Sequence, residues 1–353
     1  LYNQTNLTSL ENLHKMEIKY LELSWNEAKE KINDWNDLLS QSDFPNPFVS
    51  IAFYDAWVNT FVDDISNIKV IFFYYDNNLV GIAPLMIDIE RKTIAILGDK
   101  DLFDYRDIIV NPIYSEHIYE LLFNKITQEN NYNDFTFILE SIPEQSGLLN
   151  YSDNANTNNQ FVKLEEDVTP IINLVNDWEE YLMSLSKKQR HEVRRKVRKF
   201  EAIPTRLFEA QNFSSNLITD KIELNDFNSE FFDLFVKSRQ DKEEFLTEQR
   251  KKFFIQMLNN FADIEQLRIL CLYDDQKLIS ACIVIDYDET YFLYNNAYSL
   301  MYNSFSVGLV SKIFAIKESI DRNKKKFNFL RGNEKYKYSL GGEDIKLFNV
   351  RVN

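Results

Sequence analysis

Residues 75–83 read Tyr-Asp-Asn-Asn-Leu-Val-Gly-Ile-Ala, and residues 273–281 read Tyr-Asp-Asp-Gln-Lys-Leu-Ile-Ser-Ala. In both stretches a polar turn joins two apolar runs of strand length, which is the pattern of a β-hairpin. Similar hairpins in the two halves of the chain indicate a duplicated α/β lobe. A chance likeness is the alternative, because turn chemistry alone favours Asp and Asn. The apolar runs are residues 68–75 and 79–87 in the first half, and 267–273 and 278–287 in the second.

The elements expected around the two hairpins follow one order, which favours duplication. In the first half we expect helices over residues 24–39 and from about residue 50. After the hairpin come a strand near 93–97, a helix near 115–128 and a strand near 135–139. In the second half we expect helices near 177–185, 187–200, 228–240 and 248–260, then strand 291–298, helix 307–321 and strand 326–330.

These patterns predict a mixed α/β fold with two lobes, each a mixed central sheet flanked by helices. The polar stretch of residues 150–160 is expected to be an exposed connection. We therefore place the N-terminal lobe at residues 1–150 and the C-terminal lobe at 151–353, with the division falling between about Leu149 and Thr169. A chain of 353 residues is long enough for each lobe to bury its own core.

The composition limits the classes of function. No apolar run is long enough to cross a bilayer, and the first residues lack a basic leader and an apolar signal core, although a chain that starts with Leu can have lost a segment. Cys271 and Cys282 are the only cysteines, so neither a disulfide framework nor a metal quartet is available. We expect a cytoplasmic protein. A net charge of −15 argues against general binding of nucleic acid.

The first candidate site is the segment Tyr302–Leu309, between an expected strand and an expected helix. Ser306 is a suitable N-cap, and Gly308 has no side chain to keep a ligand from the first helical turn. Unpaired N–H groups at a helix start attract phosphate, so Ser306, Val307, Gly308 and Leu309 are the predicted cofactor-binding residues. A plain loop is the alternative. The first lobe has no glycine at its equivalent turn, which favours a donor site in the second lobe alone.

The second candidate is the basic helix Lys187–Phe200. Eight of the thirteen residues from Lys187 to Lys199 are Lys or Arg. Arg190, Arg194 and Arg198 recur at helical spacing beside an apolar stripe, and such guanidinium groups can bind phosphate or carboxylate. A solvated charged face is the alternative, and His191 is expected at the surface rather than as a base.

Two further segments carry acids, a phenol and cations. The segment Asn328–Lys337 follows the last expected strand of the second lobe, at the kind of strand end where α/β folds bind ligands. The segment Leu97–Asp107 of the first lobe places acids among aromatic residues, where a carboxyl pKa can rise far enough for proton transfer. A polar C-terminal loop and acids that cap turns are the respective alternatives.

Together these segments resemble the GNAT-superfamily acetyltransferases of cellulose and exopolysaccharide gene clusters, called CelD-like, which look like tandem-GNAT proteins related to the Fem-type aminoacyl transferases. The resemblance covers about Asn46 to Lys337. Two positions differ from the family pattern: Ser306-Val307 replaces Ser-Pro, and Asn328 replaces a common Asp. The resemblance is carried by Pro47–Ser50 with Ala56-Trp57, by Leu79–Leu85, by Phe103–Asp107, by Ser186–Arg190 with the basic helix, and by Gly332–Lys337.

The resemblance implies transfer of an acyl group from acetyl-CoA or another acyl-CoA to an amine or hydroxyl, without a metal. It implies a small-molecule or saccharide acceptor, such as a polysaccharide precursor. We expect the acceptor in the cleft between the lobes, because domain junctions commonly form pockets. The concentrated cations indicate an acceptor with phosphate or carboxylate. Alternatives are a Fem-like transferase that uses aminoacyl-tRNA, and a degenerate, non-catalytic GNAT pair that binds an anionic partner. The expected roles are base for Asp104 or Glu334, acid for Tyr336, and substrate binding for Tyr105, Arg190, Arg194 and Lys337.

Overall fold

The computed structural model describes residues 17–154, 159–201, 213–218, 221–238 and 240–353. Its contacts divide these residues into two units. The N-terminal unit holds the described residues up to Tyr54, then Val62–Glu166 and Leu347–Asn353, and the C-terminal unit holds Asp55–Phe61 and Asp167–Lys346. Residues 151–154 and 159–166 thus group with the first unit, and two short segments group with the unit that is remote in sequence.

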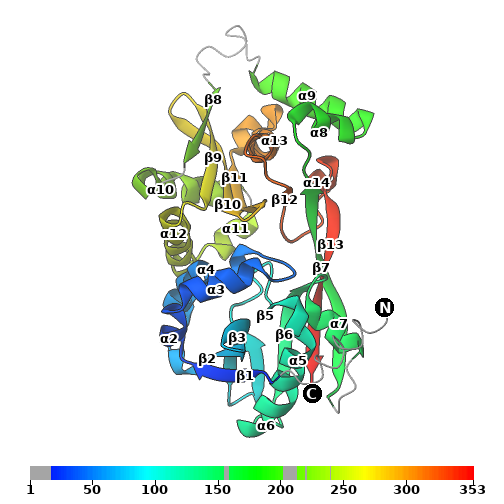
Figure 1. Cartoon of the computed structure of the whole chain (residues 1–353). Coiled ribbons are helices and arrows are strands. Elements are labelled where there is room, and N and C mark those ends of the chain that lie inside the picture. The colour runs from blue at the N-terminus through cyan, green and yellow to red at the C-terminus, as the bar shows by residue number, and fades with distance from the viewer. Residues whose placement is uncertain (1–16, 155–158, 202–212, 219–220, 239) are drawn as a thin grey trace, which may run out of the picture. The chain divides into compact units, whose positions relative to one another are not determined.

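The N-terminal unit is built on a mixed sheet in the order β1-β2-β3-β4-β6-β13 (Figure 1). Strands β2 and β3 form the first hairpin, and β4 and β6 are parallel neighbours. At the hairpin turn, Asp76 and Asn77 both have positive φ, as the tight turn requires. The strands are β1 (Lys19–Leu23), β2 (Ile68–Tyr75), β3 (Asn78–Asp88), β4 (Thr93–Ile96), β5 (Ile109–Val110, paired with β3), β6 (Thr136–Pro143) and β13 (Glu343–Val352).

Helices cover both faces of this sheet. Ile118 and Leu122 of the helical segment 115–129 pack on one face in a core with Ile71 and Phe73. On the other face, Trp35 packs edge-on against Phe72. The bounds are α2 (Trp25–Lys29), α3 (Ile32–Ser40), the 3-10 turn Pro47–Val49, α4 (Ile51–Phe61), the 3-10 turns Ile65–Asn67 and Pro112–Tyr114, α5 (Ser115–Glu120), the π-helical turn Leu121–Ile126, α6 (Thr127–Glu129) and α7 (Gly147–Asn154).

The C-terminal unit repeats this plan with the strand order β7-β12-β11-β10-β9-β8. Its hairpin strands β9 and β10 have 8 and 11 residues, the same lengths as β2 and β3. Strands β2 and β9 also have the same sequence of buried and half-buried positions along their length. The strands are β7 (Phe161–Asn173), β8 (Phe213–Ile218), β9 (Leu267–Asp274), β10 (Lys277–Tyr287), β11 (Thr290–Tyr298) and β12 (Lys326–Asn328).

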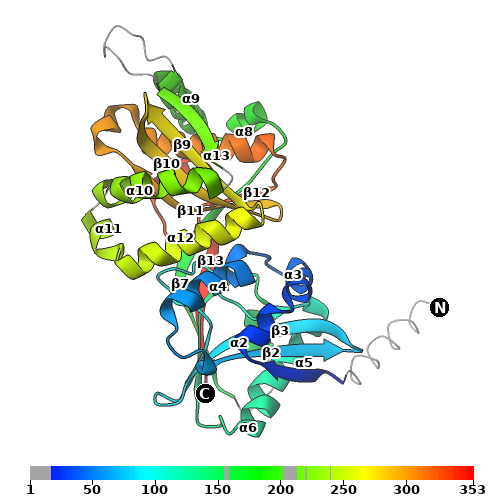
Figure 2. The ribbon, with the colours of Figure 1, turned by 90° about the vertical axis from the view of Figure 1, so that its left-hand side faces the viewer.

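In the C-terminal unit, α13 (Val307–Asp321) lies on one face of strands β9–β11, and α10 and α12 lie on the other (Figures 1 and 2). Ile313 and Ile316 of α13 enter a core with Val284 and Leu293 of the sheet. The remaining bounds are α8 (Trp178–Ser184), α9 (Lys187–Glu201), α10 (Lys221–Ser238), α11 (Gln240–Phe245), α12 (Glu248–Asp263), the 3-10 turn Leu300–Phe305 and α14 (Lys335–Ser339).

The predicted mixed α/β fold with two similar lobes is confirmed, and both hairpins lie within a residue or two of the expected bounds. Three local expectations differ. The first expected helix is two helices, α2 and α3, because the chain turns at Glu30 and Lys31. The expected helix 115–128 contains a π-helical turn, and the polar stretch after residue 149 begins inside α7 rather than as an open connection.

Candidate functional site

The start of α13 gathers unpaired backbone donors. Ser306, just before the helix, has a left-handed conformation with φ of 57°. Its carbonyl accepts the amides of Leu309 and Val310 at 2.8 and 3.0 Å. Within the described residues the amides of Val307 and Gly308 make no hydrogen bond, although both residues are buried. Buried amides without an acceptor are uncommon, so this helix start is suited to an added acceptor such as phosphate oxygen.

Ser306 does not act as the expected N-cap. Its side chain caps no amide of α13, and its hydroxyl instead accepts the Lys196 ammonium at 2.6 Å. The left-handed backbone explains the failure, because a capping side chain normally requires an extended conformation at that position.

Gly308 is needed for packing rather than for an open ligand cradle. A Cβ at this position would lie 2.7 Å from the ring of Tyr298 on β11. The glycine therefore lets the first turn of α13 approach β11 closely. A β-branched residue here would displace Tyr298, so such a change would lower the stability of the fold whatever it did to ligand binding.

The basic helix α9 presents lysines to this turn. Lys196 donates to the Ser306 hydroxyl, and the Lys199 ammonium donates to the carbonyl of Ser304 at 2.7 Å. Val193 and Phe200 are buried, as the predicted apolar stripe requires. Two cations of α9 thus lie at residues 300–308, which we call the 300–308 turn.

The arginines predicted for substrate binding lie on the other flank of α9. The guanidinium of Arg190 donates to the carbonyls of Leu182 and Leu185 at 3.4 and 3.2 Å, which satisfies the end of α8. Arg194 pairs with Glu179 of α8 at 2.6 Å, and both side chains are exposed. The structure therefore directs Arg190 and Arg194 to α8 and does not bring them to the 300–308 turn.

A buried lysine lies beneath the turn. Lys312 of α13 is 4% exposed, and its ammonium donates to the carbonyl of Gly308 at 2.7 Å. The ammonium lies 4.9 Å from the ring centre of Tyr336 and 5.9 Å from that of Tyr298. Burial lowers the pKa of Lys312 below its ordinary value.

Strands β11 and β12 separate near this lysine. Their parallel pairing covers Thr290–Phe292 and ends at the pair Phe292 and Asn328. Strand β11 continues to Tyr298, and the register with β10 is interrupted between Leu293 and Asn295, which leaves Tyr294 as an extra residue. We call this opening between the ends of β11 and β12 the fork. Tyr298 and Tyr336 approach Lys312 from its two sides.

The loop after β12 is held by Lys337. This predicted substrate-binding residue is 1% exposed, and its ammonium donates to the carbonyls of Leu330, Arg331 and Gly332 at 2.9, 2.6 and 2.9 Å. It also pairs with Glu334 at 2.9 Å. The Lys337 ammonium therefore stabilises the loop, and its side chain is too buried to contact a substrate.

The side chain of Tyr336 is largely shielded from water. Burial, followed by the charge of Glu334, raises the pKa of its hydroxyl well above the ordinary value. Its ring packs edge-on against Phe329. Of the predicted catalytic residues, Glu334 and Tyr336 thus lie together beside the fork.

The segment of the first lobe is organised differently from the prediction. Tyr105 is fully buried, with its ring 4.8 Å from that of Phe44, so it is a core residue. Asp104 is half-buried. The acid with the raised pKa is Asp107, whose pKa burial raises to about 7, against hydrogen bonds from Ser146 and the Ile108 amide that lower it. The residue predicted as a base in this segment is Asp104, and that role stays a prediction.

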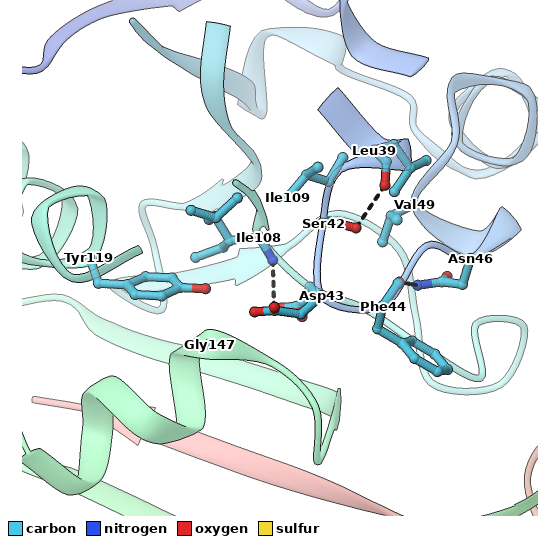
Figure 3. A pocket seen from close by; sticks show the side chains of 12 residues that line it. Leu39, Ser42, Asp43, Phe44, Asn46, Val49, Ile108, Ile109, Tyr119 and Gly147 are labelled. Atoms are coloured by element: carbon cyan, nitrogen blue, oxygen red, sulfur yellow. Dashed lines mark hydrogen bonds between the residues drawn. The ribbon is translucent and has the colours of Figure 1, made fainter. Parts of the chain in front are cut away.

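Asp107 and Asp43 line a small pocket of the N-terminal unit (Figure 3). Tyr119 lines the same pocket. The volume, about 20 Å³, is room for one water molecule. Burial raises the pKa of Asp43 as well. Two carboxylates with little water between them make this pocket unsuited to phosphate.

Comparison with protein families identifies the segment that carries the fork. Residues 187–338 match the model described as acetyltransferase (GNAT) domain. This segment of the C-terminal unit therefore resembles a GNAT domain, and we call residues 187–338 the GNAT domain. A comparison with curated proteins finds no match.

Solved structures resemble the chain as a whole. The crystal structure of FemX covers 94% of this chain and 96% of its own, with a TM-score of 0.62 at 10% identity. The C-terminal domain of a putative lysylphosphatidylglycerol synthetase from Agrobacterium fabrum covers 92% and 91%, with a TM-score of 0.53 at 10% identity. A tandem GNAT protein of the clavulanic acid pathway covers 95% and 98%, with a TM-score of 0.51 at 11% identity. The fold is therefore tandem GNAT-like.

The part of the chain that the structure describes has no helix long and apolar enough to cross a bilayer. Within the same residues, no group of three or more His, Cys, Asp or Glu side chains could hold a metal ion. The narrower resemblance to the CelD-like proteins stays a prediction, as does an acceptor between the two units.

Sequence reasoning missed three residues of the GNAT domain: Lys196, Lys199 and Lys312. The helical spacing of α9 contained a signal, because Lys196 and Lys199 lie on the flank opposite Arg190 and Arg194 across the apolar stripe. Lys312 falls at a buried position of an apolar helix, where a lysine is rare unless paired. That departure from the apolar pattern could have identified it.

Proposed function

We propose that the GNAT domain binds an acyl thioester of the acyl-CoA class at the start of α13 and transfers the acyl group to an amine or hydroxyl. The observation that supports this most is the positive charge at one turn of an acidic protein. Lys196 and Lys199 contact the 300–308 turn, Lys312 lies beneath it, and two amides there lack acceptors. The helix dipole adds to the same field, so a pyrophosphate fits this turn.

The rest of the donor would extend along β11 into the fork. Alignment of the nucleophile with the carbonyl would supply much of the rate, and the resemblance suggests that backbone amides near residues 294–298 stabilise the oxyanion. Two protons must then move. The nucleophile loses one to a base, for which Glu334 and Asp104 are the candidates, and the leaving thiolate gains one, for which Tyr336 is the candidate from the resemblance.

The acceptor is proposed only as a class. A small molecule or saccharide with an amine or hydroxyl fits a GNAT reaction, and membership in polysaccharide biosynthesis rests on the CelD-like resemblance. Arg190 and Arg194 remain proposed acceptor-binding residues, but their contacts with α8 weaken that role.

An aminoacyl-tRNA donor is the second candidate, favoured by the similarity of the whole chain to FemX. Its terminal adenosine and phosphates would use the same cations. The two donors differ in salt dependence, because a tRNA displaces many counterions and a thioester few. A non-catalytic pair that binds an anionic partner is the remaining alternative.

Thermal unfolding with acetyl-CoA, a longer acyl-CoA and free CoA tests the proposal. A ligand that binds only the folded state stabilises it by about 2.7 kcal/mol at a concentration of about 100 times Kd. We expect the midpoint to rise with ligand concentration, and the rise to be lost in a Lys196→Met/Lys199→Met variant. If no thioester shifts the midpoint while an aminoacyl-tRNA binds with steep salt dependence, the acyl-CoA donor is wrong.

A further inference from the structure

Lys312 is an unusual buried cation. Its side chain is 4% exposed, yet within the described residues the ammonium forms no ion pair. Its one hydrogen bond goes to the Gly308 carbonyl at 2.7 Å, so the other two N–H donors have no hydrogen-bond acceptor. A buried charge without a counter-charge is strongly disfavoured, and a lysine in that position releases its proton more easily.

The groups around Lys312 do not supply a counter-charge. Tyr298 of β11 and Tyr336 of α14 offer ring faces. Among charged or titratable neighbours, Cys282 of β10 and Glu334 raise its pKa, whereas Lys337 lowers it. Glu334 is itself paired with Lys337 at 2.9 Å, which reduces its effect on Lys312. Burial is the largest influence and favours the neutral amine.

The position of this amine links it to the proposed donor site. Cβ atoms of a helix tilt toward its N-terminus, and Lys312 follows that direction back to the carbonyl of the first turn. An anion bound to the amide of Gly308 would lie within roughly 9 Å of the Lys312 nitrogen, from one residue length and two hydrogen bonds. The missing counter-charge would then arrive with the ligand.

We propose that Lys312 holds its proton less firmly while the turn is empty and more firmly when an anionic donor binds, so that donor binding draws a proton onto the amine and its ammonium becomes a counter-charge for the donor's phosphate. This rests on the proposed function for the place of binding. A unit charge at roughly 8 Å, at an effective dielectric constant of about 20, shifts an ionisation equilibrium by about one to two powers of ten. Donors that carry phosphate are therefore favoured over neutral thioesters of the same acyl group.

The pH dependence follows from the sign of this linkage. At low pH Lys312 is charged in both states, so donor affinity is constant. As pH rises through the pKa of the empty protein, binding must draw a proton from solution, and affinity falls until the pKa of the bound state is passed. A rise in affinity with pH over this window would contradict the proposal.

Calorimetric titration with CoA and with inorganic pyrophosphate, in two buffers of different ionisation enthalpy, measures the proton uptake directly. We expect the full-length protein to take up a fraction of a proton per site in a pH window that lies below the ordinary pKa of lysine. Lys312→Met should abolish the proton uptake that depends on Lys312, and it should weaken binding of CoA and of pyrophosphate at low pH by about tenfold or more. Lys317→Met is the matched control, because Lys317 is an exposed lysine of the same helix.

Lys312→Arg keeps a charge at every pH in the window, so it should bind both anions without the uptake and without the fall in affinity. If Lys312→Met fails to fold, the Lys312→Arg variant alone tests whether Lys312 takes up the proton. Equal uptake in the wild type and Lys312→Arg would overturn the inference. CoA binding without uptake that depends on Lys312 would overturn the inference and leave the proposed function standing. Pyrophosphate binding with that uptake but no CoA binding would overturn the donor class alone, and binding of neither anion would overturn both.

Discussion

Asp107→Asn should change how the stability of the N-terminal unit depends on pH. Burial raises the pKa of Asp107 from an ordinary value near 3.8 to about 7 in the folded protein. Between these values the folded state holds a proton that the unfolded state has released. Stability that depends on this group is therefore fully present below about pH 4 and is lost as pH rises to about 7.

The magnitude follows from the shift. About three pKa units at about 1.4 kcal/mol each give an upper value of about 4 kcal/mol, and access of water to the pocket lowers it to about 2–4 kcal/mol. Asparagine keeps an oxygen that can accept the hydrogen bonds from the Ile108 amide and the Ser146 hydroxyl, at 2.8 and 2.9 Å to Asp107. The substitution thus removes the charge and retains the contacts.

Urea unfolding followed by the fluorescence of Trp25 and Trp35, both buried in this unit, reports the effect. We expect the variant to gain stability over the wild type as pH rises from about 4 to about 7, and no further gain above that. Asp101→Asn is the control, because Asp101 is an exposed acid of the same segment. A stability difference that does not change with pH would refute the desolvation of Asp107.

Two further sets of substitutions test the C-terminal unit. Gly308→Ala should destabilise the protein by about 1–3 kcal/mol in urea unfolding, because the new Cβ meets the Tyr298 ring at 2.7 Å. In a protein that already carries Tyr298→Ala, the same change should leave the free energy of unfolding nearly unaltered. An unaltered free energy of unfolding in the single variant Gly308→Ala would contradict the packing role. Lys196→Met and Lys199→Met should each weaken CoA binding by up to about tenfold and reduce its salt dependence, whereas Arg194→Met should not. An equal loss in Arg194→Met, measured by the same titration, would move the anion to the α8 side of α9.

Local patterns predicted the hairpins and α13 well. The turn residues and the apolar runs of β9 and β10 are properties of neighbouring residues, and the bounds of α13 match the expected 307–321. The long strands β7 and β13 were not predicted. Strand β13 pairs with β6, so its place depends on residues far away in the sequence. Pairing at that distance leaves no local signal.

The donor site at the start of α13 stays a prediction, but the structure decides which of the predicted side chains lie near it. The sequence placed a ligand at the start of α13 and cations on α9, but both flanks of α9 carry cations. Which flank faces the 300–308 turn depends on how α9 packs, and the structure selects Lys196 and Lys199. Lys337 and Tyr105, both predicted to bind substrate, are buried in the structure. The spacing of residues in the sequence does not determine how exposed such side chains are.

The segments that follow the third strand of the hairpin sheet differ in charge between the two units. Each places a hairpin before a third strand that pairs in parallel with a later one, β4 with β6 and β11 with β12. After β11 the chain forms the 300–308 turn, where lysines of α9 collect. After β4 it forms the segment with Asp107, whose carboxyl shares a pocket with Asp43. A phosphate would be attracted to the first place and repelled from the second, so charge alone favours one donor site, in the GNAT domain.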